Sequence, residues 1–303
     1  MSSTNGSKSG CDLRRLGVVV HPTRDVDEPM GEIHDWARER DVSVGQIPFG
    51  SAGRRVADAV EADDQDLILA IGGDGTTLHA IRSGAPKERP VLGVACGSLG
   101  ALTTVPAHHV GEALERFANG DWVERKLPAL SIRVDGVDEA TAFNDLVLVR
   151  QGEGQLRVSA EVDGTLFARF AGDGCIVSTP IGSSAYTIAA GGPLLPVGLS
   201  AYALTTLPAH GGFRPPLILE SESELELEVV AGFGGSRLEI DGQTRQLKAR
   251  TISIRLQPDA ATVVAFRDQH PFLTQLRQRG IISDSPRIIA EDERQQVAEA
   301  QES

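Results

Sequence analysis

Along the first third of the chain, short apolar runs alternate with segments in which apolar residues recur at every third or fourth position. Apolar runs bounded by turn residues predict buried strands, and apolar residues at every third or fourth position predict helices. The predicted strands cover residues 16–20, 42–47, 66–71 and 90–95, and the predicted helices cover 29–40, 52–62, 76–83 and 110–119. Strands that alternate with helices form βαβ units, so we predict an α/β domain with a mostly parallel sheet over residues 15–125.

The pattern changes near residue 126, where short alternating runs separated by Gly or Asp-Gly turns predict a β-rich second domain over residues 126–268. The predicted strands cover residues 130–134, 142–150, 156–162, 166–170, 175–178, 225–230, 238–240, 251–256 and 262–266. One helical piece, 183–190, interrupts them. A last helix, 271–278, belongs to a segment over 269–288 that we expect to pack back on the first domain.

Both ends of the chain are polar. Residues 1–14 are rich in Ser and Gly, and residues 289–303 are acidic and Gln-rich without apolar periodicity, so we predict disordered tails. No run approaches the roughly 18 apolar residues of a membrane helix, and the N-terminus lacks the pattern of a secretory signal. We therefore expect a cytoplasmic protein without a membrane partner.

The charge argues against a nucleic-acid partner, because the chain carries a net charge of −13 and no basic stripe. The three cysteines lie far apart without metal-ligand spacing. Four Lys against 25 Arg, on an acidic chain, are typical of a salt-adapted protein, although a GC-rich genome would also favour Arg. A melting temperature that rises steeply towards molar KCl would support salt adaptation, and a flat one would exclude it.

The candidate chemistry lies at residues 72–76, with the sequence Gly-Gly-Asp-Gly-Thr, directly after the buried run 66–71. Ligands of open α/β sheets bind at the carboxyl ends of strands. Gly72, Gly73 and Gly75 let a phosphate approach the backbone, and the N-terminus of the following helix favours its negative charge.

A carboxylate in that place would repel a phosphate, so Asp74 needs another task. Two candidates are binding of a bridging Mg²⁺ and acceptance of a proton from an attacking hydroxyl. The alternative is an ordinary helix cap, for which Asp is a common residue. The position after a buried strand favours the functional reading.

Four further segments occur in order: Phe-Asn-Asp-Leu-Val at 143–147, Asp-Gly-Cys-Ile-Val-Ser-Thr-Pro-Ile-Gly-Ser-Ser-Ala-Tyr at 173–186, Ala-Gly-Gly-Pro at 190–193 and Asp-Gly-Gln at 241–243. Together with residues 72–76 and Arg82, they resemble the NAD kinase family over residues 16–280. That family phosphorylates the 2′-hydroxyl of the adenosine ribose of NAD. The resemblance implies the two-domain NAD kinase-like fold, with the second domain binding nucleotide.

The resemblance also implies residue roles. Asp74 would be the general base and a partner of Mg²⁺ or another divalent cation, and ATP or polyphosphate would be the donor. The implied donor-phosphate residues are Gly72, Gly73, Gly75, Thr76 and Arg82. The implied NAD-binding residues are Asn144, Asp145, Asp173, Thr179, Ser184, Ala185, Tyr186, His210, Asp241 and Gln243. In the family, the residue at Asp173 reaches NAD bound by a neighbouring subunit, which implies a homodimer or homotetramer.

Several positions depart from the family pattern. Ala95 stands where Asn is usual, Ala101 where an aromatic is usual, and Asp145 where Glu is usual; Ile181 and Ala189 replace a common Thr and Ser. The catalytic loop is intact while the acceptor pocket is altered. Two alternatives therefore stay open: a kinase for a different nucleotide or small hydroxyl acceptor, and a pyridine-nucleotide-binding protein without catalysis.

Overall fold

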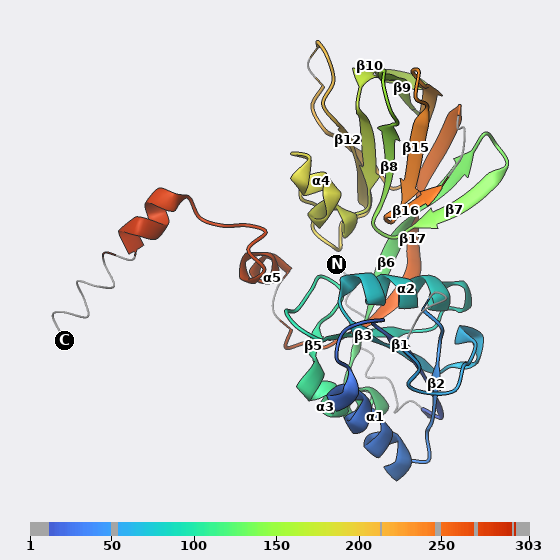
Figure 1. Cartoon of the computed structure of the whole chain (residues 1–303), viewed down its shortest axis with the longest axis vertical. Coiled ribbons are helices and arrows are strands. Elements are labelled where there is room, and N and C mark those ends of the chain that lie inside the picture. Colours follow the sequence, from blue (N-terminus) through green and yellow to red (C-terminus); the bar gives the residue numbers. More distant parts are fainter. Residues whose placement is uncertain are drawn as a thin grey trace.

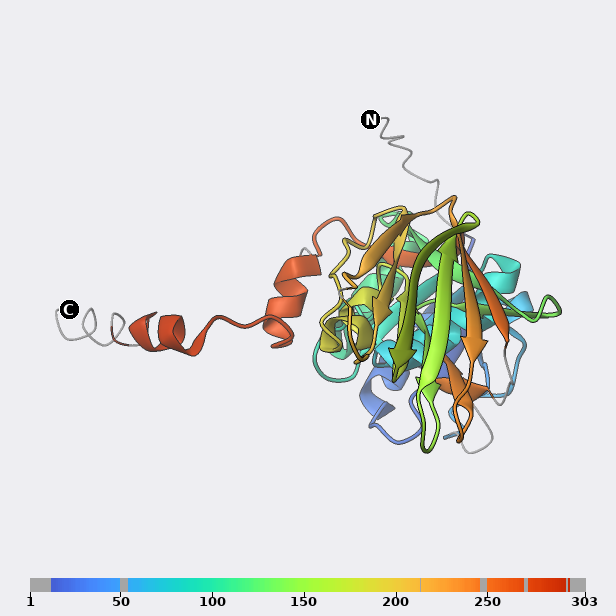
Figure 2. The ribbon, with the colours of Figure 1, turned by 90° about the horizontal axis from the view of Figure 1, so that it is seen from above.

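The computed structural model describes residues 12–49, 54–212, 214–245, 250–269, 272–292 and 294. Figure 1 shows an α/β half below and a β-rich half above, with the C-terminal segment reaching out to one side. Figure 2 shows the strands of the β-rich half lying over the α/β half. Among the described residues, no helix is long and apolar enough to cross a membrane.

The α/β half is built on parallel strands in the order β4-β3-β1-β2. Its strands are β1 (Arg15–Val20), β2 (Ser43–Gln46), β3 (Leu67–Gly72), β4 (Val91–Ala95) and β5 (Val105–Pro106), and its helices are α1 (Asp27–Glu39), α2 (Asp74–Gly84) and α3 (Val110–Ala118). All six residues of β3 are buried. Leu69 packs with α1 and α3 on one face, and Ile68 packs with α2 on the other.

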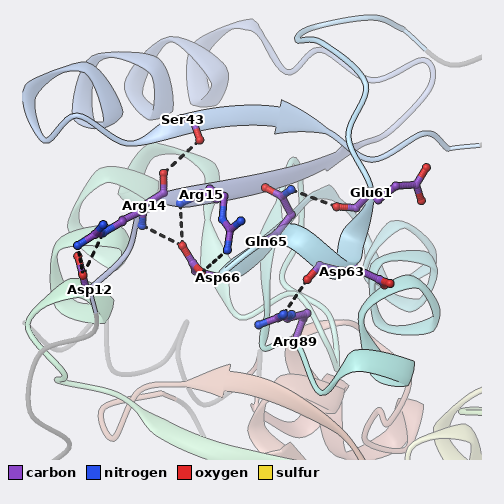
Figure 3. A network of polar contacts seen from close by, with 9 residues as sticks. All are labelled: Asp12, Arg14, Arg15, Ser43, Glu61, Asp63, Gln65, Asp66 and Arg89. Atoms are coloured by element: carbon purple, nitrogen blue, oxygen red, sulfur yellow. Dashed lines mark hydrogen bonds and ion pairs between the residues drawn. The ribbon is translucent and has the colours of Figure 1, made fainter.

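The amino end of β1 is held by side chains from its neighbours (Figure 3). The Asp66 carboxylate accepts hydrogen bonds from the backbone N–H groups of Arg14, at 3.0 Å, and Arg15, at 2.8 Å. The Ser43 hydroxyl donates to the carbonyl of Arg14 at 3.1 Å. These contacts fix β1 between β2 and β3, and so fix which residues emerge at the opposite, carboxyl edge of the sheet.

The β-rich half contains two layers. One is a six-stranded antiparallel sheet in the order β13-β12-β11-β8-β15-β16. Its strands are β8 (Asp145–Arg150), β11 (Gly174–Ser178), β12 (Ala201–Thr206), β13 (Leu217–Glu220), β15 (Ser236–Ile240) and β16 (Gln243–Arg245). The other layer holds β6 (Val123–Val134), β7 (Asp138–Ala142), β9 (Leu156–Val162), β10 (Thr165–Gly172), β14 (Glu224–Val230) and β17 (Thr251–Ala265). Alternate residues of the two layers form one core.

One sheet runs through both halves. β17 pairs antiparallel with β14 and β6 in the upper part, and Val263 near its end pairs with Val91 of β4. Eleven strands therefore form a continuous sheet. The predicted architecture, an α/β domain with a mostly parallel sheet followed by a β-rich domain, is confirmed. The exact domain boundaries stay predictions.

The helix predicted over residues 52–62 is wrong. Residues 52 and 53 lie outside the described part, and 54–61 form no helix. The backbone of this segment bonds to β2 instead: Gln46 N–H donates to the carbonyl of Asp58 at 2.7 Å, and Val60 N–H donates to that of Gln46 at 2.9 Å. The Gln46 side chain adds bonds to Arg54 and Val56. The edge strand β2 thus forms hydrogen bonds with backbone N–H and C=O groups that would otherwise bond to each other within a helix.

The other helices and strands predicted in the first third begin and end within two residues of their predicted bounds. Four strands of the second half, β7, β12, β13 and β16, were not predicted. β12 contains Tyr202, whose side chain is fully buried and donates a hydrogen bond to the carbonyl of Ser223 at 2.9 Å. The predicted helical piece 183–190 is a 3₁₀ turn followed by α4 (Tyr186–Ala189), and 271–278 contains α5 (Phe272–Gln278).

Candidate active site

The glycine loop connects β3 to α2. A Cβ atom at Gly72 would lie 2.4 Å from Thr76 Oγ1, so only glycine fits there. A Cβ atom at Gly75 would meet nothing within 4 Å, so the backbone beside it is open. Thr76 is 2% exposed, and its hydroxyl has no hydrogen-bond partner in the described part of the chain. The loop therefore combines open backbone at Gly75 with a buried, unpartnered hydroxyl at the N-terminus of an eleven-residue helix.

Asp74, the first residue of α2, is held by the loop that follows β4. Its Oδ2 accepts a hydrogen bond from Ala101 N–H at 3.0 Å. Its Oδ1 accepts from Leu102 N–H at 3.0 Å and from the Thr103 N–H and hydroxyl, each at 3.2 Å. A Cβ atom at Gly100 would lie 1.9 Å from Asp74 Oδ1, so glycine there makes this contact possible. The carboxylate is fixed in position yet 29% exposed.

Positive side chains adjoin the loop. Arg24, in the segment after β1, donates to the carbonyl of Cys96 at 3.0 Å, and its guanidinium would be 3.6 Å from a Cβ atom at Gly73. Arg279, after α5, places Nη2 3.4 Å from Asp74 Oδ2. His21 directly follows β1, the strand beside β3, and its Nδ1 accepts hydrogen bonds from Thr23 and Arg24 N–H. Burial and the charge of Arg24 lower its pKa.

Arg82 and Asp241, which the resemblance assigns to donor and NAD binding, pair with each other. Arg82 Nη2 lies 3.0 Å from Asp241 Oδ2, and the Asp241 side chain is 0% exposed. Asp241 also accepts from the N–H groups of Phe143, Asn144 and Asp145 at 3.0, 2.7 and 3.1 Å. The pair ties α2 to the turn between β15 and β16. The structure thus gives both residues a bracing contact between the halves.

Thr179 connects the second motif to residues 143–144. Its hydroxyl donates to the carbonyl of Phe143 at 2.6 Å and accepts from Gly182 N–H at 3.1 Å. A Cβ atom at Gly182 would lie 1.9 Å from the carbonyl oxygen of Asn144, so only glycine permits this approach. Leu78 of α2, Phe143 and Ile181 share one core cluster, which brings this motif next to the α2 helix.

The residues predicted to line an adenosine pocket differ in exposure. Ser184 is half-buried and donates to the carbonyl of Ile181 at 2.9 Å. Ala185 is exposed and Tyr186 is 44% exposed, so an aromatic face is open to a ligand. Asn144 Oδ1 is buried and has no hydrogen-bond partner in the described structure.

Asp145 is buried at the start of β8. Desolvation, with added repulsion from Asp241 and Glu239, raises its pKa to about 7. A carboxyl with this pKa changes charge near neutral pH and can act as a hydrogen-bond donor below it.

Asp173 and His210 lie at the other end of β8. Asp173 pairs with Arg150, the last residue of β8, at 2.5 Å, and His210 N–H donates to the carbonyl of Ala171 at 3.1 Å. The six residues of β8 separate this pair from Asp145 by roughly 17 Å. A single chain therefore does not bring Asp173 to residues 144 and 145. Gln243 is exposed on the short edge strand β16.

The departures from the family pattern are spread over several elements. Ala95, the last residue of β4, is 2% exposed, and Ala101, in the loop that holds Asp74, is 8% exposed. Ile181 is buried in the core cluster. Ala189 is exposed on α4.

A divalent cation would find few protein ligands here. The described residues contain no group of three or more His, Cys, Asp or Glu that could hold a metal ion. Asp74 is the carboxylate at the glycine loop, and both of its oxygens already accept hydrogen bonds. Mg²⁺ in kinases is held by one or two carboxylates together with substrate phosphates and water. The available protein ligands therefore fit a cation that is held mainly by the phosphates of a bound substrate.

Comparison with known proteins decides the family. The family model of the ATP-NAD kinase N-terminal domain matches residues 19–122. The model of the ATP-NAD kinase C-terminal domain matches residues 143–266. The chain belongs to the NAD kinase family. It is therefore a phosphotransferase of the kinase class.

Several NAD kinases are similar over most of their length. The NAD kinase of Heliobacterium modesticaldum is 34% identical over 246 residues, which cover 76% of this chain and 85% of the relative. That of Nocardia farcinica is 35% identical over 230 residues, 74% of this chain and 68% of the relative.

Two solved structures share the fold. Yeast NADH kinase complexed with NADH has a TM-score of 0.76 at 19% identity, over 94% of both chains. An NAD kinase from Archaeoglobus fulgidus in complex with ATP has a TM-score of 0.70 at 23% identity, over 89% of this chain and 100% of the other.

The sequence analysis missed Arg24, Thr103 and Arg279. A signal existed for the first two, because β1, β3 and β4 are parallel neighbours and the loops after them must meet at one edge. Arg279 had no such signal, since its position depends on how the C-terminal segment packs.

Proposed function

We propose that this kinase transfers the terminal phosphoryl group of ATP, or of polyphosphate, to the 2′-hydroxyl of the adenosine ribose of NAD, and that Asp74 accepts the hydroxyl proton. One observation carries the proposal: Asp74 is fixed by three successive backbone N–H groups at a phosphate-binding glycine loop and is still 29% exposed. A general base needs this combination of fixed position and access.

The donor's phosphates lie on Gly72, Gly73, Gly75 and Thr76. Phosphoryl transfer depends mainly on in-line positioning and on positive charge at the phosphates. The open backbone at Gly75 and the unpartnered Thr76 hydroxyl suit this task. A divalent cation bound to the phosphates supplies further charge neutralisation, with Asp74 as its protein partner. The ATP complex of the Archaeoglobus relative supports ATP as donor.

The adenosine of NAD binds where Asn144, Asp145 and residues 184–186 meet. The buried, unpartnered Asn144 Oδ1 is a free acceptor, and Tyr186 offers an exposed aromatic face. Asp173 and His210 act on NAD held by a neighbouring copy, since they lie at the far end of β8. This requires a homo-oligomer. The NADH complex of the yeast relative supports a pyridine nucleotide as acceptor.

The test is to incubate the purified protein with NAD, ATP and Mg²⁺ in molar KCl and to measure NADP. The Asp74→Asn variant is the control, and its circular dichroism spectrum must match that of the wild type. NADP from the wild type alone supports the proposal. A folded wild type that makes no NADP from ATP or polyphosphate contradicts it.

A second candidate keeps the chemistry and changes the acceptor. Small residues at Ala95 and Ala101, where the family carries larger or polar ones, favour it. Phosphorylation of another hydroxyl-bearing nucleotide, faster than that of NAD in a parallel screen, would select this candidate.

A further inference from the structure

The glycine loop lies beside two guanidinium groups that no predicted role explains. Arg24 comes from the segment after β1, and Arg279 comes from the segment after α5. Arg82, the cation expected at the donor, lies eight residues beyond Asp74 on α2, roughly 12 Å along the helix. Because Arg82 is paired with Asp241, the positive charge at the loop must come from other residues.

Arg24 is held at the loop by a single contact. Its Nη1 donates to the carbonyl of Cys96, and the guanidinium would contact Cβ atoms at Gly73 and Gly97, at 3.6 and 3.4 Å. In the described part of the chain, it forms no ion pair with a carboxylate. The remaining N–H groups of its five-donor fork are thus free for an anion between the loops after β3 and β4.

Arg279 approaches from the C-terminal side. Its Nη2 is 3.4 Å from Asp74 Oδ2, whereas its Nη1 is buried and has no hydrogen-bond partner in the described structure. Leu276 of α5 is 0% exposed, so this segment is packed in place. A buried guanidinium nitrogen without a partner is costly. An anion bound at the loop would give this nitrogen an acceptor.

We propose that Arg24 and Arg279 bind the phosphates of a nucleoside triphosphate or polyphosphate donor, one on each side of the Gly72–Thr76 loop. This assignment rests on the proposed function and names residues of that same site. Both arginines form charge-assisted hydrogen bonds to phosphate oxygens, aided by the N-terminus of α2. Arrival of the donor also draws Arg279 away from Asp74, which frees one carboxylate oxygen for the acceptor hydroxyl.

The test measures binding of the imido analogue of ATP with Mg²⁺, and of inorganic tripolyphosphate, by titration calorimetry without NAD. Arg24→Gln and Arg279→Gln should each weaken both ligands by about tenfold or more. Arg24→Lys and Arg279→Lys should recover part of the loss. Binding of NAD should stay within about twofold of the wild type in all four variants.

Two control variants each remove an exposed arginine that pairs with a carboxylate away from the glycine loop. Arg38→Gln removes an exposed guanidinium from α1, where it pairs with Asp35. Arg277→Gln removes one from α5, where it pairs with Asp284. Both should bind the analogue like the wild type, because neither lies at the loop.

The outcomes separate this proposal from the proposed function. Analogue binding that is lost in both glutamine variants supports the assignment, even if the wild type makes no NADP. Unchanged analogue binding in the folded glutamine variants overturns it, even if NADP is formed at the normal rate. A wild type that binds neither triphosphate ligand also overturns it.

Discussion

Asp74 and Asp241 have nearly the same local structure in the two halves of the molecule. Each carboxylate accepts the backbone N–H groups of three successive residues, 101–103 for Asp74 and 143–145 for Asp241. Each also faces an arginine from a distant segment. They differ in access: the Asp74 side chain is 29% exposed and that of Asp241 is 0% exposed.

That difference in exposure distinguishes a carboxylate that can take part in catalysis from one that only stabilises the fold. A buried, fully paired carboxylate contributes to the geometry of the fold, and removing Asp241 leaves the partly buried Arg82 guanidinium without its partner. A partly exposed carboxylate with the same bonds keeps a fixed position and can still meet a substrate. Hydrogen bonding alone therefore does not identify a catalytic residue, and solvent access has to be added.

The largest effect is expected from Asp74→Asn. Loss of the general base should lower kcat by about 10²- to 10⁴-fold. The amide keeps one acceptor for the loop, so the urea midpoint should change little. Stopped-time assays of NADP and equilibrium unfolding test this pair of results. A variant that keeps wild-type kcat would exclude Asp74 as the base.

Asp241→Ala should have the reverse profile. It leaves three N–H groups and Arg82 without their acceptor, at a cost of about 3–5 kcal/mol in the free energy of unfolding. Urea denaturation measures this cost. Arg82→Ala in the Asp241→Ala background should then cost little more, because the two changes break one interaction. Additive losses of unfolding free energy in the double variant would contradict a stabilising Arg82–Asp241 interaction.

Gly100→Ala tests whether the position of Asp74 matters. The new methyl group would lie 1.9 Å from Asp74 Oδ1, so the carboxylate or the loop must move. A shift of about 1 Å lowers catalysis on the order of 100-fold. Gly31→Ala is a control for a glycine-to-alanine change away from the site, on α1, where the Cβ meets nothing within 4 Å and φ is not positive. Wild-type kcat in Gly100→Ala would show that the loop adapts freely.

The last prediction concerns the pH dependence that Asp145 gives to stability. Its carboxyl has a pKa of about 7 in the folded protein against an ordinary value of 3.8. Between these values the folded state holds the extra proton, so the free energy of unfolding falls as pH rises from about 4 to about 7 and levels off above. Asp145→Asn should be more stable than the wild type at pH 8 and no more stable at pH 4. Parallel pH profiles of the two proteins would contradict the raised pKa.

The fold class followed from the sequence because the apolar patterns were strong. Residues 67–72 are buried throughout, and a helix begins shortly after them, at Asp74, as the sequence pattern predicted. Failures came where tertiary contacts override local preference. Residues 54–61 carry a helical pattern, but the exposed edge of β2 takes up their backbone groups. β12 was missed because its Ala-Tyr-Ala-Leu-Thr-Thr sequence has weak alternation.

The site was only partly predictable. Asp74 and its glycines could be identified because strand, loop and helix are contiguous in sequence. The partners of Asp74 could not, because residues 101–103 and Arg279 come close only through folding. For the same reason the pairing of Arg82 with Asp241, which spans 159 positions of the chain, could not be predicted from the sequence.

The eleven-stranded sheet also limits how the molecule can move. β6 and β17 both pass between the halves, and they stay paired from Val123 to Val134 apart from one irregularity between Gln257 and Ala261. A flexible linker would allow one half to rotate against the other, but two hydrogen-bonded strands resist bending. The spacing between the glycine loop and residues 143–145 is therefore set before any nucleotide arrives. The structure therefore argues against nucleotide binding by a swing of one half against the other.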